Sequence, residues 1–65
     1  MKVVKGHKIL SDLNADGWYI DRQKGSHRQF KHPIKEGTVT FNGTPSTDFY
    51  GKLLKSIENK SGLIF

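Results

Sequence analysis

The chain must fold around one thin hydrophobic core, because it is short and has no covalent staple. It has 65 residues and no cysteine, so neither a disulfide framework nor a thiolate metal cluster can support it. A domain of this length buries only about 60% of the surface that its unfolded chain exposes. We therefore expect a single domain, residues 1–65, with no large substrate cleft, and a reducing cytoplasm as its compartment.

No segment of the sequence is suited to a membrane or to secretion. The N-terminal residues lack the apolar stretch of a signal peptide. No apolar run approaches the roughly 20 residues that a membrane span needs. The prediction is a soluble protein without a membrane partner.

The first half of the chain predicts a helix followed by a hairpin. Apolar residues recur at helical spacing over residues 6–16, and Gly17 follows where a left-handed cap would end the helix. Residues 18–23 alternate, with Trp18, Ile20 and Arg22 on one side. Gly25 can take a positive φ in a turn, so residues 27–32 are expected to pair back as a second strand.

The second half predicts one more strand and a second helix. Pro33 opens a loop, and the β-branched residues over 38–42 indicate a third strand. Asp48 is a candidate N-cap for the second helix, which ends near Gly62. These elements form an α+β fold, a two-layer α-β-β-β-α sandwich. Its expected core consists of Ile9, Leu13, Trp18, Ile20, Phe30, Val39, Phe41, Leu53, Leu54 and Ile57.

The charge of the chain favours a polyanionic partner. Eleven Lys and Arg outnumber six acids and give a net charge of +5, and no acid lies between Arg22 and Lys35. A basic stripe of this kind attracts nucleic acid. A surface that only keeps the protein soluble is the alternative.

His27 is the candidate catalytic residue. Phe30 fixes the parity of its strand, so Arg28 and His32 are expected on the helix-packed face or its rim, and His27, Gln29 and Lys31 on the open face. An imidazole can exchange protons near neutral pH, and cations can stabilise the charge that builds on a phosphorane. The predicted RNA-binding residues are Arg22, Lys24, Gly25, Ser26, Arg28 and Lys31.

The other chemical candidates are weaker. His7 and His32 are interpreted as ordinary solvated histidines. Asp21 could orient His27 across the hairpin or form an ion pair with Lys31. The histidines and acids lack the spacing of metal ligands, so no metal site and no cofactor are predicted. Ser26 has no recognisable base or oxyanion hole for acyl transfer.

The sequence resembles the HicA family of toxin ribonucleases over nearly its whole length. The resemblance is carried by Gly17-Trp18, Arg22, Lys24-Gly25-Ser26-His27, Phe30, His32-Pro33, Gly37-Thr38-Val39-Thr40, Leu53-Leu54-Lys55-Ser56-Ile57 and Gly62-Leu63. It implies a small mRNA-cleaving toxin with a fold like a double-stranded-RNA-binding domain, catalysis by the histidine of the Gly-Ser-His turn, and a HicB-type antitoxin. Many members carry a further histidine after the third strand, whereas residues 41–48 here have none.

The sequence therefore predicts a metal-independent endoribonuclease that cleaves single-stranded mRNA with His27. A tight complex with an acidic antitoxin is expected to bury His27 or its rim. Two alternatives remain open: a non-catalytic RNA-binding module, and a basic partner of an acidic regulatory protein.

Overall fold

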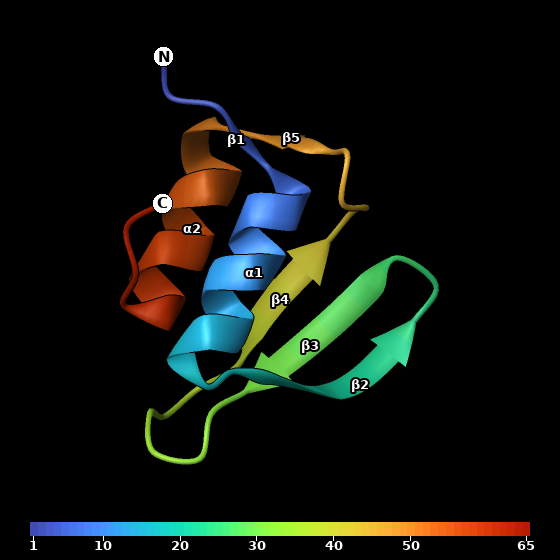
Figure 1. Ribbon diagram of the computed structural model, residues 1–65, viewed down its shortest axis with the longest axis vertical. Helices are drawn as coiled ribbons and strands as arrows, with labels where there is room; N and C mark the ends of the chain where they lie inside the picture. Colours follow the sequence, from blue (N-terminus) through green and yellow to red (C-terminus); the bar gives the residue numbers. More distant parts are fainter.

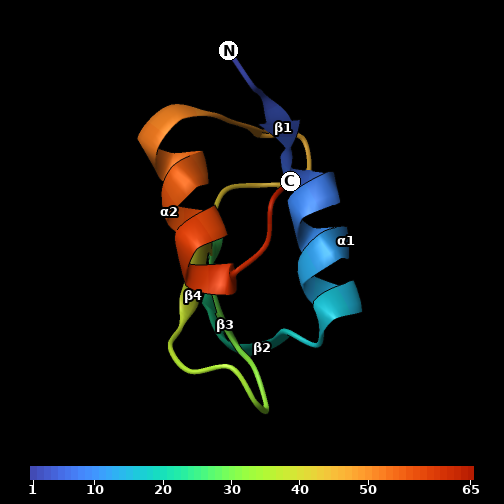
Figure 2. The same cartoon turned by 90° about the vertical axis from the view of Figure 1, so that its left-hand side faces the viewer.

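A computed structural model describes all 65 residues, and it confirms the α-β-β-β-α arrangement of an α+β fold. Figure 1 shows helix α1 in front of a three-stranded sheet, and Figure 2 shows that α2 runs beside the sheet rather than in front of it. Neither helix is long and apolar enough to span a bilayer. The elements are β1 (Val4–Lys5), α1 (Gly6–Asp16), β2 (Tyr19–Lys24), β3 (His27–Lys31), β4 (Val39–Asn42), β5 (Asp48–Phe49) and α2 (Gly51–Ser61).

The strands form two antiparallel sheets. The larger sheet has the order β2-β3-β4, which is the predicted meander, and α2 packs against its edge strand β4. The smaller sheet pairs β1 with β5 and was not predicted from the sequence. Because β1 leads directly into α1, and β5 is followed by Tyr50 and α2, this pairing holds the first turns of the two helices together.

Helix α1 has the predicted bounds, and the loop before β5 caps it. The amides of Gly6 and His7 donate to the carbonyl oxygens of Thr47 and Pro45, at 2.8 Å in each case. A Cβ atom at Gly6 would lie 2.2 Å from the carbonyl oxygen of Thr44. Only glycine allows the loop to approach this closely. The helix ends at Gly17, whose φ of 104° is left-handed, as predicted.

Helix α2 begins later than predicted, and its buried face also differs from the prediction. Asp48 is not an N-cap: it lies in β5 and pairs with Lys5 at 2.6 Å. The N-cap position belongs to Tyr50, which has an extended backbone and makes no side-chain capping bond. The helix buries Leu54 and Ile57 together with Glu58 and Ser61, whereas Leu53 is 50% exposed. The prediction that Leu53 belongs to the core is wrong.

The core otherwise matches the sequence pattern. Val4 and Phe49, which come from the unpredicted small sheet, complete it, and the rings of Phe41 and Phe49 lie 4.8 Å apart. Complete burial of such side chains contributes about 1.5–3 kcal/mol each. The predicted core residues that are buried are Ile9, Leu13, Trp18, Phe30, Val39, Phe41, Leu54 and Ile57.

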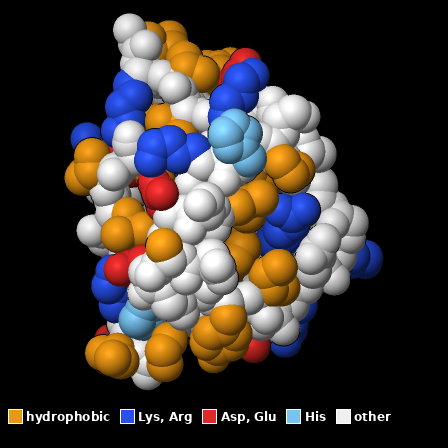
Figure 3. Space-filling model, in the orientation of Figure 1, with side chains coloured by type: hydrophobic (Ala, Val, Ile, Leu, Met, Phe, Trp, Pro, Cys, Tyr) orange, Lys and Arg blue, Asp and Glu red, His pale blue; other side chains and the backbone are white.

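Ile20 is the second predicted core residue that is not buried. It pairs with Phe30 and so projects from the helix side of the sheet. Strand β2 is, however, the outer strand, and Ile20 is 49% exposed. It lines a groove with Leu10 and Trp18. Figure 3 shows the apolar side chains that gather beside α1 on this face.

His32 is a structural residue, so its interpretation as a solvated histidine is wrong. Its side chain is 8% exposed and meets the Trp18 ring edge-on at 5.1 Å. The Nδ1 atom accepts hydrogen bonds from the amides of Ile34 and Lys35, both at 3.0 Å. The Nε2 atom therefore carries the proton and donates to the carbonyl oxygen of Asp16 at 2.7 Å.

Candidate functional site

The candidate site is built on the hairpin turn between β2 and β3. Gly25 has a φ of 59°, whereas Ser26, like every residue of the chain that is not glycine, has no positive φ. A positive φ at the first central position alone is the pattern of a type II′ turn. The turn is held to the end of β4. The amide of Gly43 donates to the carbonyl oxygen of Ser26 at 3.1 Å, and the Ser26 hydroxyl donates to Oδ1 of Asn42 at 3.4 Å. These bonds fix the start of β3, where His27 lies.

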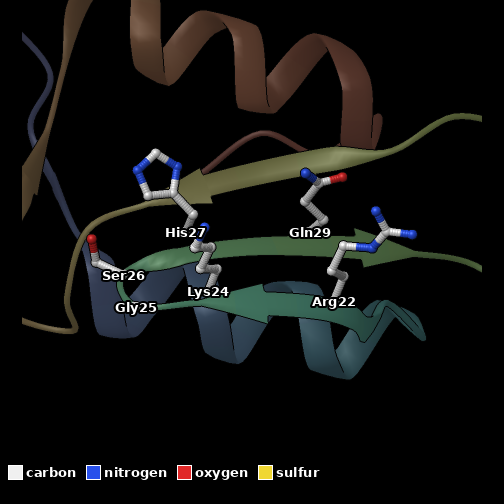
Figure 4. A pocket seen from close by; sticks show the side chains of 6 residues that line it. All are labelled: Arg22, Lys24, Gly25, Ser26, His27 and Gln29. Carbon is white, nitrogen blue, oxygen red and sulfur yellow. The ribbon is translucent and has the colours of Figure 1, made fainter.

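A β-bulge brings two cations to the face of the sheet that carries His27. The register shifts between Ile20 and Arg22, and beyond the shift Arg22 pairs with Gln29 and Lys24 with His27. Paired residues project from the same face of a sheet. Strict alternation had placed Arg22 on the side of Trp18 and Ile20, so the extra residue reverses its direction. Figure 4 shows the side chains of Arg22, Lys24, His27 and Gln29 on one face of the hairpin.

These side chains surround an open hollow of about 650 Å³ with no hydrophobic residue in its lining. Most of the predicted site residues meet here, and Gln29 joins them. Sequence reasoning had placed Gln29 on this face without assigning it to the site. The hollow is lined by Arg22, Lys24, Gly25, Ser26, His27 and Gln29.

Two predicted RNA-binding residues lie elsewhere. Arg28 projects from the helix side of the sheet, with its guanidinium 5.6 Å from the centre of the Phe41 ring. Lys31 is on the open face but pairs with Tyr19 at the far end of the hairpin. Arg28 therefore faces away from His27, and Lys31 does not line its hollow.

The hollow carries uncompensated positive charge. The ion pairs of the chain use Lys2, Lys5, Lys8, His32 and Lys35, so no acid neutralises Arg22 or Lys24. Asp21 makes neither of its predicted contacts, with His27 or with Lys31, because it is the unpaired residue of the bulge. An exposed imidazole beside two unpaired cations is an arrangement that attracts phosphate groups. No group of three acids or histidines is close enough to hold a metal ion.

His27 also borders a second, smaller hollow that the sequence did not reveal. It measures about 260 Å³ and lies between β4 and α2, with Asn42, Leu53 and Lys60 among its lining residues. The available signal was the spacing of Leu53, Ser56 and Lys60, which places them along one side of α2. Sequence reasoning had assigned Leu53 to the core.

One family of known proteins matches nearly the whole chain. The family described as "HicA toxin of bacterial toxin-antitoxin" matches residues 6–63. The chain belongs to the HicA toxin family. It is thus the toxin of a bacterial toxin–antitoxin pair and has an antitoxin as its partner. No curated protein matches the chain.

In this HicA-family toxin, the segment after β4 that lacks a histidine serves the fold. Its residues Pro45 and Thr47 supply the carbonyl oxygens that cap α1. The Thr47 hydroxyl accepts from the amide of Thr44 at 2.9 Å and so closes the loop on itself. His27 is thus the histidine of the open face, since His32 is packed against Trp18 and His7 lies in the first turn of α1.

Proposed function

We propose that this toxin is an endoribonuclease that cleaves single-stranded mRNA with His27 as general base and needs no metal ion. The observation that carries the proposal is the pairing across the bulged hairpin, which puts Arg22 and Lys24 on the face of His27. General base and electrostatic stabiliser must both reach one phosphate, and this face offers both groups within the same hollow.

The reaction can be written with these groups alone. Neutral His27 accepts the proton of a ribose 2′-hydroxyl, and the 2′-oxygen attacks the adjacent phosphorus. The bond from phosphorus to the 5′-oxygen breaks, and that oxygen takes a proton from solvent, to which the hollow is open. Lys24 and Arg22 stabilise the charge on the non-bridging oxygens. The products are a 2′,3′-cyclic phosphate and a 5′-hydroxyl.

The partner that we propose is a HicB-type antitoxin which covers the His27 face. Unpaired cations around an exposed histidine suit an acidic protein surface, and such a surface would remove both the access of RNA and the field that attracts it. A complex in which His27 stays open to solvent would contradict direct occlusion.

The test compares His27→Ala with His7→Ala on a long single-stranded RNA. Both histidines are exposed, so each variant should keep the stability of the parent within about 0.5 kcal/mol. Loss of general acid-base catalysis typically costs about 10²- to 10⁴-fold in rate. We expect that loss for His27→Ala alone, with RNA binding retained.

Equal cleavage by the parent and by His27→Ala would remove His27 from the mechanism. If the parent binds RNA but leaves it intact, the chain is a non-catalytic RNA-binding module. If the parent neither binds nor cleaves RNA, the basic face serves only the acidic partner.

A further inference from the structure

The second hollow beside His27 has the size of a site for one small planar group. Its volume of about 260 Å³ is below the roughly 300–1,000 Å³ of clefts that hold drug-sized ligands. The same imidazole lines this hollow and the cationic one. Whatever occupies the smaller hollow therefore lies next to the phosphate whose cleavage His27 would catalyse as general base.

The apolar part of this hollow is supplied by two residues of α2, Leu53 and Ile57. Leu53, in the first turn of α2, is 50% exposed and lines the hollow together with the buried Ile57. Removing apolar surface from water is favourable. A flat base lying on Leu53 would cover this surface, whereas a phosphate would not benefit from it.

The rim of the hollow carries two groups with hydrogen bonds to donate, Asn42 and Lys60, beside the hydroxyls of Thr40 and Ser56, which can donate or accept. Oδ1 of Asn42 already accepts the Ser26 hydroxyl, so the amide NH₂ group is the part left to face a ligand. Lys60 forms no ion pair within the chain and has only donors to offer. Uracil and guanine present carbonyl acceptors where cytosine and adenine present an amino group. Since the hydroxyls of Thr40 and Ser56 suit either kind of edge, the donors of Asn42 and Lys60 decide the preference and favour keto bases.

We infer that the hollow between β4 and α2 is a base pocket that binds one keto base, uracil or guanine, of the RNA strand next to the phosphate at His27. Asn42 reads the carbonyl oxygen and Leu53 supports the ring. The inference rests on the proposed RNA-cleaving function of this face, and it adds the determinant of sequence preference. Beyond the pocket, a further hollow that shares Ser56 and Lys60 is lined by Lys52 and Lys55. These lysines give the strand a cationic exit along α2.

The test measures binding of the uridine decamer U₁₀ and the cytidine decamer C₁₀. The two bases have the same size and differ in the keto and amino groups, so the ratio of the two dissociation constants isolates the reading of that edge. All proteins carry His27→Ala, which prevents cleavage during the measurement. The parent in this test is the protein with His27→Ala as its only change. We expect it to bind U₁₀ about three-fold or more tightly than C₁₀, a difference that corresponds to one hydrogen bond.

Asn42→Ala should bring the ratio to about one, and Asn42→Asp should invert it, because a carboxylate accepts from the cytosine amino group. Asn42→Asp also weakens both affinities by its charge, which the ratio cancels. Lys31→Ala, at the far end of the open face, is the control and should leave the ratio unchanged. A parent ratio of one, or an unchanged ratio in both Asn42 variants, would overturn the pocket. If the toxin without the His27→Ala change cuts no RNA while the ratio behaves as expected, only the proposed reaction fails.

Discussion

At the scale of single residues, the polar cluster around Asp16 shows how a chain without disulfides joins its elements. The Asp16 carboxylate accepts from Lys35 at 2.6 Å and from the Trp18 indole at 3.1 Å. Lys35 also donates to the carbonyl oxygen of Ser61 at 3.1 Å. The loop that carries Lys35 is thereby tied to the last turns of both helices. The hydrogen bond from Lys35 holds the pKa of Asp16 below its ordinary value.

The lowered pKa values of two carboxyl groups, Asp16 and Glu58, predict how the stability of the fold responds to acid. The pKa of Glu58 is lowered in the same way, first by the hydrogen bond from Lys2. A carboxyl group with a lowered pKa in the folded state stabilises the fold above its unfolded pKa, and this contribution is lost as the pH falls through the folded pKa. We expect Asp16→Asn to be less stable than the parent in urea at neutral pH. The difference should vanish in strong acid, where both side chains are uncharged. A difference that persists unchanged at low pH would show that the charge of Asp16 is irrelevant.

At the scale of elements, the sequence predicted what periodicity controls and missed what local irregularity controls. The bounds of α1, the three-stranded meander, the turn at Gly25 and the direction of His27 follow from spacing and from glycine. The bulge at Asp21 could not be predicted because nothing in an alternating strand marks where an extra residue enters. The small β1–β5 sheet was missed because Asp48 fits an N-cap as well as a strand. Leu53 and Leu54 both lie at helical spacing from Ile57, so spacing alone could not tell which of the two is buried.

The buried face of α2 predicts a large loss of stability on substitution of Leu54 and a small loss on substitution of Leu53. Leu54 is 4% exposed and Leu53 is 50% exposed. Leu54→Ala should therefore cost about 2–5 kcal/mol of unfolding free energy, enough to unfold much of a domain this small. Leu53→Ala should cost about 0.5 kcal/mol or little more, as at an ordinary surface position. Urea denaturation of both variants measures this difference. Equal losses would mean that α2 packs in another phase.

At the scale of the whole molecule, the charges are segregated. Most acids are neutralised where they stand, so the excess positive charge concentrates on the open face of the sheet and along α2. The acids that are paired with lysines are Asp12, Asp16, Asp48 and Glu58. A face with this charge attracts a polyanion, and the bulge puts Arg22 and Lys24 on the side of the sheet that carries His27. The same face would attract the proposed acidic antitoxin.

The most direct test of RNA cleavage at this face examines the ends of the cleaved strands. The toxin is incubated with a single-stranded RNA and with a copy that carries 2′-O-methyl groups throughout, and the end groups of the fragments are identified. If His27 activates the 2′-hydroxyl, the RNA gives 2′,3′-cyclic phosphate and 5′-hydroxyl ends, and the methylated copy stays intact. Cleavage of the methylated copy, or fragments with 5′-phosphate ends, would contradict the mechanism.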